Sequence, residues 1–398
     1  MILFTVSLML LAQEPESRFP GFMGGNPAYT SRFDNAFNPA MAVVFDGLAT
    51  VSESDDPDQN TARMHLFEID LASRIDPLGW AYAVIAFEDD GGENVGSVEE
   101  AAIWIDNLGG NFSLRAGKYL GDFGKWGTIH QHDRAYVNDP GPSAEFLGGE
   151  FLLTGVELHH WFGIGDLPVR WSVGVAPEFG EAEAGVDNGG VPEFGGVALG
   201  RRTPSSFVYT GRITAQQDVG LNGFFQYGLS AMHTPDGLVA ALDTDHDGVV
   251  DAEYEASQTT VALDLTLRLP DPTDLTGHTV SVEASFNSRE AYDQANAALE
   301  SHEANGLWGY YEYTFSPRWA VGAFGAWWQS AGNDRGSDWF TGTEAGATEA
   351  GYVTLNLSHF NRLRLQIGQD TPVDGEPAWT ASLQWTVILG NHTHSLDW

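Results

Sequence analysis

Residues 243–251 carry oxygen-bearing side chains with the spacing of a calcium-binding loop. They read Asp-Thr-Asp-His-Asp-Gly-Val-Val-Asp, so oxygen ligands alternate and a glycine stands sixth, where a sharp turn is needed. Tyr254 replaces the bidentate glutamate expected at the twelfth position, which predicts weak binding, and the alternative is a solvated acidic loop. The predicted ligands of a structural Ca²⁺ are Asp243, Asp245, Asp247, Val249 and Asp251.

Histidines form two further candidate metal sites. His130, His132 and Asp133 are close in sequence, and imidazole and carboxylate groups are both zinc ligands. His392 and His394 form a second pair. We expect the two groups at opposite faces of a membrane, so they cannot share one ion. The alternative is that these histidines act only as hydrogen-bonding residues.

The sequence offers little for catalysis. It contains 0 Cys, which excludes a disulfide framework, a thiolate nucleophile and a Cys-ligated zinc ion. It has no nucleophile motif, phosphate-binding glycine loop or HExxH motif. His159 and His160 are adjacent in a predicted strand, so their side chains face opposite sides. We predict that the protein is not an enzyme, and its formal charge of -37 opposes binding to nucleic acid.

Alternation with period 2 dominates the chain. In 258–269, for example, Leu263 and Leu265 lie on one face and Asp264 and Thr266 on the other. Such segments have about ten residues, the length that a tilted strand needs to cross a bilayer. About sixteen can be marked, an even number as in bacterial barrels: 41–51, 63–73, 80–88, 98–106, 112–120, 151–162, 168–177, 205–215, 220–232, 258–269, 278–289, 306–315, 318–329, 349–358, 361–369 and 378–389.

The connections between these segments are short on one side and mostly long and acidic on the other. The long ones are 121–150, 178–204, 233–257, 290–305 and 330–348. This asymmetry is typical of outer-membrane barrels, whereas a soluble β-sandwich has no reason to show it. We therefore predict an all-β protein, a transmembrane antiparallel β-barrel of about 16 strands whose third extracellular loop folds inward.

The N-terminus has the layout of a secretory signal. An apolar run is followed by Ala12 and a polar break, although the usual Lys or Arg before the run is missing, and the alternative is a buried first strand. We expect a signal peptide at 1–12, a periplasmic segment at 13–39, the barrel at 40–390 and a C-terminal tail at 391–398. The segment 13–39 is too short for the plug of a TonB-dependent transporter.

Several segments resemble a group of porin-like barrels of Gram-negative bacteria. Residues 37–44 resemble the start of the first strand in that group. Residues 114–125 resemble a strand-to-loop passage that the group shares with phosphate-selective porins, and in the group this passage leads to a His-rich segment, here 130–140. Residues 383–385 and the His-bearing tail resemble its ending, but Trp398 departs from the usual terminal Phe. Some members are described as zinc-regulated outer-membrane receptors, so the resemblance implies a barrel and raises zinc as a candidate ligand.

Charged residues are unevenly placed on the predicted lumen face. The predicted pore-lining residues are Arg115, Arg170, Arg212, Arg268, Arg362, Arg364, Glu283 and Glu312. Further acidic residues share the wall: Glu68, Asp70, Glu157 and Asp264. The third outer loop, predicted to form the constriction, carries Asp122, Lys125, Asp133 and Asp139. Charges facing one another across a pore set ion selectivity, and the alternative is that they only form ion pairs in the wall.

The sequence thus predicts a porin of the bacterial outer membrane that allows passive diffusion of small hydrophilic solutes or ions. One alternative is a dedicated divalent-metal (zinc) uptake channel. A second is a structural or adhesive surface barrel with a closed lumen. The expected partners are outer-membrane lipid, lipopolysaccharide and the transported solutes, with a homotrimer as one option for assembly. Apart from Ca²⁺, no cofactor is expected.

Overall fold

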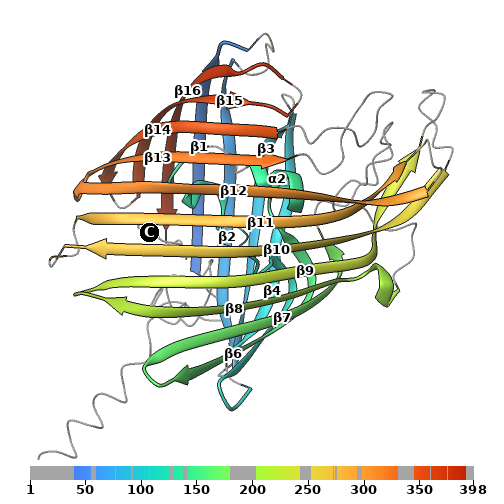
Figure 1. The fold of residues 1–398 in the computed structure, drawn as a ribbon. Coiled ribbons are helices and arrows are strands. Elements are labelled where there is room, and N and C mark those ends of the chain that lie inside the picture. Colours follow the sequence, from blue (N-terminus) through green and yellow to red (C-terminus); the bar gives the residue numbers. More distant parts are fainter. Residues whose placement is uncertain are drawn as a thin grey trace, which may run out of the picture.

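The chain forms one closed barrel of sixteen antiparallel strands, in which each strand pairs with the next and β1 pairs with β16 (Figure 1). The structure, a computed structural model, describes residues 40–54, 60–76, 78–90, 93–106, 108–125, 127, 129–137, 141–179, 203–242, 252–271, 273, 276–293, 298–329, 345–358, 360–373 and 375–390. The predicted fold class, an all-β barrel of about 16 strands, is confirmed. The predicted signal peptide, periplasmic segment and C-terminal tail lie outside the described residues.

The strands are β1 (Ala40–Ser52), β2 (Thr61–Asp76), β3 (Gly79–Asp90), β4 (Glu93–Ile105), β5 (Phe112–Leu120), β6 (Leu152–Ile164), β7 (Leu167–Phe179), β8 (Val208–Val219), β9 (Gly223–Leu242), β10 (Ala252–Pro270), β11 (Gly277–Asp293), β12 (Ala298–Ser316), β13 (Trp319–Gln329), β14 (Ala345–Ser358), β15 (Asn361–Thr371) and β16 (Ala378–Gly390). Short helical segments are η4 (Gln131–Asp133), α2 (Gly141–Leu147) and η6 (Pro204–Ser206). Among the described residues, no helix has the length and apolar character needed to cross a membrane.

Alternation along the strands gives the barrel an apolar outer face and a polar inner face. On β10, Leu263 and Leu265 are 49% and 48% exposed, whereas Asp264 between them is 0% exposed. The same contrast separates Leu383 and Trp385 from the buried Gln384 on β16. An apolar outer band around a polar interior is what a barrel needs to span a bilayer, because lipid can contact only the outside. The chain is therefore a membrane-spanning barrel.

Some strands are longer than the alternation predicts. The long connections expected at 233–257 and 290–305 are wrong in extent, because β9 to β12 continue through most of both segments. Leu242 pairs with Ala252, and Asp293 pairs with Ala298. Figure 1 shows these four strands projecting beyond their neighbours at one end of the barrel. Backbone pairing between adjacent strands continues past the length that a bilayer requires, so hydropathy did not reveal it.

The seam between β1 and β16 is closed by polar groups on the inner face. Asp46 accepts hydrogen bonds from the hydroxyl of Thr386 at 2.6 Å and from Nε2 of Gln384 at 2.9 Å. Thr50 and Ser382 form a further bond of 3.1 Å between their hydroxyls. Backbone pairing along the seam runs from Ala42 with Gly390 to Ser52 with Thr380. The closed seam leaves neither strand with an open edge in the membrane.

Candidate functional site

The segment 121–151, here called the third loop, joins β5 to β6 and is bound to strands on other parts of the wall. Its contacts reach β9, β10, β11 and β15, so this segment lies against the inner face of the barrel. Its main chain provides most of these hydrogen bonds: Gly124 N to Ser230 Oγ at 3.0 Å, Lys125 N to Glu283 Oε2 at 2.6 Å, Val137 N to Gln366 Oε1 at 2.9 Å, and Gln258 Nε2 to Phe146 O at 2.6 Å.

Gly124 allows the close approach of the loop to Glu283. Its φ of 59° lies in the left-handed region, and a Cβ there would lie 2.5 Å from Oε2 of Glu283. Any side chain would therefore strain the backbone and also separate the loop from the wall. Glycine at this position lets the next amide, that of Lys125, reach the carboxylate of Glu283.

Aromatic side chains of the third loop pack into the interior at two places. Phe123, Phe146 and Phe151 belong to a buried cluster that includes Trp80 and Trp104 of the wall. Farther along the loop, the ring of Tyr136 stacks on Phe324 with 4.2 Å between centroids and also contacts Trp308. Burial of each aromatic ring removes a large apolar area from water, so both clusters stabilise the docked loop.

Asp122 begins the third loop between two arginines. Its Oδ1 lies 2.8 Å from Nη2 of Arg170 and 3.5 Å from Nε of Arg212, and its Oδ2 accepts a 2.5 Å hydrogen bond from Ser172. Burial alone would raise the pKa of Asp122, but Arg170 and Arg212 hold the pKa well below its ordinary value. The carboxylate is therefore charged and compensated inside the barrel.

Five of the six predicted wall arginines divide into two kinds. Arg115 pairs with Glu157 at 2.6 Å, and Arg212 bonds both oxygens of Asp264 at 2.7 and 2.9 Å. These arginines, like Arg170, form buried ion pairs. The second kind, Arg362 and Arg364, donates hydrogen bonds to carbonyl groups of the third loop.

Arg362 and Arg364 connect β15 to the third loop. Nη2 of Arg362 donates to the carbonyl oxygen of His132, and Nη1 of Arg364 donates to that of Tyr136 at 3.5 Å. Arg364 also donates to Gln384 at 2.8 Å. Both arginines are only 2% exposed. They act as fixed donors that hold residues 132–136 of the loop.

The other predicted lining residues have mixed positions. Glu283 is 1% exposed, whereas Arg268 and Glu312 are half-buried. Burial on the inner face is compatible with lining a pore, but the lining role of all these residues stays a prediction. Asp139 and the predicted calcium ligands Asp243, Asp245, Asp247, Val249 and Asp251 lie outside the residues that the structure describes.

Lys125 carries a positive charge into this part of the lumen. Burial lowers its pKa to about 8, although Asp264 and Glu283 act in the opposite direction. Its side chain thus titrates close to neutral pH, far below an ordinary lysine.

The predicted zinc residues of the third loop meet carboxylates of the wall. His130, His132 and Asp133 are 1%, 0% and 0% exposed. Glu68 on β2 and Glu99 and Glu100 on β4 contact the histidines, and Asp70 on β2 lies next to Glu68. We call these seven residues the carboxylate–histidine cluster. Five carboxylates face two imidazoles, so acidic groups outnumber imidazoles in the cluster.

Each imidazole of the cluster contacts carboxylates. His130 has Nε2 3.0 Å from Oε1 of Glu100 and Nδ1 3.5 Å from Oε2 of Glu99. His132 has Nδ1 3.3 Å from Oε2 of Glu68, and the two imidazole rings are stacked with 5.7 Å between centroids. Burial alone would lower the pKa of His130, but the neighbouring carboxylates of Glu100 and Glu99 raise it well above its ordinary value.

Glu99 and Glu100 were not predicted as site residues. Strict alternation would direct one of two adjacent side chains outward, into lipid. In the structure a β-bulge interrupts the pairing of β3 with β4, since Val84 pairs with Glu100 but Ile85 pairs with Val98. The bulge leaves Glu99 as an extra residue, and both glutamates are buried, at 6% and 0% exposed. The sequence signal was the pair itself, because a glutamate facing lipid would be costly.

Comparisons with known proteins identify a fold. No protein-family model matches the chain. A curated protein of Aquifex aeolicus (strain VF5), called "Uncharacterized protein", is 28% identical over 161 residues, which are 38% of this chain and 31% of that protein. The match thus spans about a third of that relative's length and assigns no activity.

Solved structures of bacterial porins and channels share the fold at low sequence identity. The chain is similar to the outer membrane channel DcaP of Acinetobacter baumannii, with a TM-score of 0.54 and 11% identity over 90% of this chain and 99% of that one. It is also similar to an anion-selective porin from Comamonas acidovorans, with a TM-score of 0.53 and 9% identity over 88% and 99% of the two chains. The trimer form of the outer membrane protein OmpT of Vibrio cholerae gives a TM-score of 0.52 and 10% identity over 88% and 99%. Together with the apolar outer band, these likenesses show that the chain has the fold of the porins of the bacterial outer membrane.

Proposed function

We propose that this barrel is a porin that lets small hydrophilic solutes or ions diffuse across the outer membrane. The observation that carries the proposal is a closed barrel with an apolar outside, a charged inner wall and a third loop docked against that wall. A docked loop narrows a lumen, and the charges that remain facing it select among ions. The fold alone does not decide this, since one architecture serves several functions.

The fixed charges of the lumen favour cations. Arg115, Arg170 and Arg212 are compensated by carboxylates at ion-pair distance. In the carboxylate–histidine cluster, in contrast, five carboxylates face two imidazoles. We therefore expect the channel to pass cations more readily than anions.

The alternative of a dedicated divalent-metal uptake channel requires an ion site that exchanges readily with the pore. His130, His132 and Asp133 are at most 1% exposed, which favours the general porin. The third candidate, a closed structural or adhesive barrel, predicts no conductance.

Planar-bilayer recording separates these candidates. The purified barrel, inserted from detergent, should give discrete conductance steps in KCl, and a KCl gradient should give a reversal potential of the sign expected for cations. A barrel that inserts but gives no steps would contradict the porin proposal. Reversal of the sign would contradict the assignment of selectivity and leave the channel itself supported.

We further propose a homotrimer, as in the trimer form of Vibrio cholerae OmpT. Sedimentation in a density-matched detergent measures the protein mass directly, and a mass of one chain would contradict this assembly.

A structural Ca²⁺ in 243–251 also stays a proposal. Millimolar Ca²⁺ should protect this segment from protease, and Asp245→Ala should abolish the protection, since such sites bind at about 10⁻⁴–10⁻³ M.

A further inference from the structure

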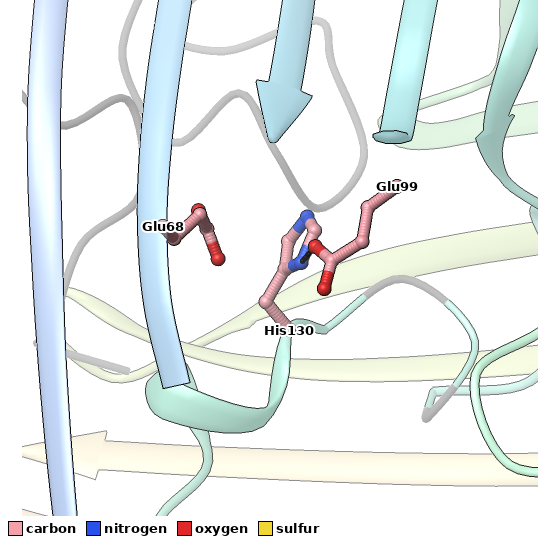
Figure 2. Close-up of side chains that lie close together, drawn as sticks. All are labelled: Glu68, Glu99 and His130. Atoms are coloured by element: carbon pink, nitrogen blue, oxygen red, sulfur yellow. Dashed lines mark ion pairs between the residues drawn. The ribbon is translucent and has the colours of Figure 1, made fainter. Parts of the chain in front are cut away.

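Three side chains from three segments of the chain converge inside the barrel. Glu68 comes from β2, Glu99 from β4 and His130 from the third loop, and one ligand atom of each lies within 4.8 Å of those of the other two. Figure 2 shows the imidazole of His130 between the two carboxylates. They are 0%, 6% and 1% exposed, so water does not screen their charges.

The carboxylates of Glu68 and Glu99 retain buried oxygens without hydrogen bonds. In the part of the chain that the structure describes, neither oxygen of Glu68 accepts a hydrogen bond, nor does Oε2 of Glu99. Leaving a buried carboxylate without donors is costly, and buried charges are normally paired or coordinate metals. Oε2 of Glu68 lies 3.3 Å from Nδ1 of His132. These oxygens are therefore available to a cation.

His130 is oriented as a metal ligand would be. Its Nε2 lies 3.0 Å from Oε1 of Glu100, and Oε2 of Glu100 accepts further hydrogen bonds from Tyr82 at 3.2 Å and from the amide of Leu120 at 3.0 Å. When an ion binds, a carboxylate held in this way keeps the ring hydrogen on Nε2, so that Nδ1 is the ligand atom. Nδ1 is on the side of Glu99, at 3.5 Å from its Oε2.

We propose that Glu68, Glu99 and His130 bind one divalent transition-metal ion, for which Zn²⁺ is the natural probe, and that Glu100 orients His130. Two carboxylates and one imidazole form a ligand set that zinc accepts, whereas Ca²⁺ and Mg²⁺ prefer oxygen ligands alone. Two ionised carboxylates also balance the charge of the ion.

The bound ion fastens the third loop to the wall. Two ligands belong to the strands β2 and β4, and the third belongs to the loop, so coordination adds a cross-link close to Arg362, which holds the carbonyl of His132. An ion at so buried a place is a resident ion and not a solute in transit. The inference is thus independent of what the pore conducts.

The test is zinc binding to the folded barrel in detergent, measured by competition with a chromophoric chelator. All variants carry His392→Ala and His394→Ala, so that the histidines of the tail cannot bind zinc. The barrel with these two substitutions alone is the reference barrel. We expect one strong site per chain, weakened at least tenfold by His130→Gln, Glu68→Gln or Glu99→Gln. His159→Gln is the matched control, because His159 is equally buried and lies 2.8 Å from Glu157 but outside the cluster.

Two further readouts connect binding to these ligands and to the loop. Co²⁺ in place of Zn²⁺ should give visible d–d absorption that His130→Gln abolishes and His159→Gln preserves. Zinc should also protect the third loop from protease in the reference barrel but not in Glu68→Gln, with circular dichroism confirming that each variant is folded. Absence of a strong site in the reference barrel, or equal affinity in His130→Gln and His159→Gln, would overturn the proposal. Conductance is not measured, so failure here leaves the porin proposal unaffected.

Discussion

Oδ1 of Asp122, at the start of the third loop, lies 2.8 Å from Nη2 of Arg170 in the wall of the barrel. Nε of Arg212 lies 3.5 Å from the same oxygen, and the three charged groups are almost fully buried. The carboxylate of Asp122 therefore fastens the loop, where it leaves β5, to arginines of the two strands β7 and β8.

Asp122→Asn should destabilise the barrel by about 3–5 kcal/mol, because it leaves buried guanidinium groups without compensating charge. Equilibrium unfolding in urea measures this change. Asp166→Asn, in the exposed turn between β6 and β7, is the control and should stay within about 0.5 kcal/mol of the parent. Equal stability of both variants would contradict the role of Asp122.

The same pair predicts how stability depends on pH. Since the pKa of Asp122 is lower in the folded barrel than in the unfolded chain, its contribution is complete above about pH 4 and decreases as the pH falls through the folded value. The difference in unfolding free energy between the parent and Asp122→Asn should therefore shrink at strongly acidic pH. A difference that grows as the pH falls would contradict this sign.

Replacing Arg362 and Arg364 together by Gln should release residues 132–136 from β15 and remove two positive charges from the lumen. We expect a larger single-channel conductance and a higher cation-to-anion permeability ratio, measured by reversal potentials in a KCl gradient. Arg318→Gln removes a charge from the exposed turn 317–318 and should change neither quantity. A conducting double variant with parental conductance and selectivity would exclude both arginines from these roles.

Lys125 should make selectivity depend on pH between 7 and 9. Its pKa of about 8 means that it loses its positive charge over this interval, so the preference for cations should increase as the pH rises. Reversal potentials at the two pH values measure the shift. Lys125→Gln has no charge to lose and should show a smaller shift, and an equal shift in both channels would assign it to other groups.

Leu365→Arg tests the outer face of β15. Leu365 is 48% exposed between the buried Arg364 and Gln366, so the new guanidinium would face lipid. Near the middle of the bilayer this costs roughly 2–4 kcal/mol, measured by unfolding from lipid vesicles. Leu221→Arg, in the exposed turn between β8 and β9, should cost much less. Equal effects of the two substitutions would argue against a lipid-facing position for Leu365.

The sequence predicted the barrel because the strand signal is local. Each of the sixteen predicted segments overlaps one observed strand, and the segment 112–120 coincides with β5. Other strands begin later than predicted because a turn precedes them. The helical turn η6 occupies Pro204–Ser206, so β8 begins at Val208. Gly220 and Asn222 have positive φ angles and form the turn before β9, which begins at Gly223.

Only some residues of the carboxylate–histidine cluster could be predicted from the sequence, because the positions of the others depend on tertiary contacts. His130 and His132 were visible as a local pair, but Glu99 enters the site through a bulge that no period-2 pattern contains. Likewise, six arginines could be assigned to a face, while their partners could not. Asp122 meets Arg170 and Arg212 only after the third loop has docked, and the choice between ion pairs and free lining charges depends on that docking.

The polar seam between β1 and β16 also determines when the barrel can be completed. Asp46 and Thr386, which bond across it, are 340 positions apart in the chain, so this contact forms only after nearly all of the chain has been synthesised and exported. Until then two strand edges expose unpaired amides and carbonyls, which lipid cannot satisfy. Pairing at such large sequence separation is also slow. An intermediate in which β16 has not yet paired would therefore expose unpaired strand edges on β1 and β15. Protection of these edges from pairing with other chains would then limit the yield of closed barrels.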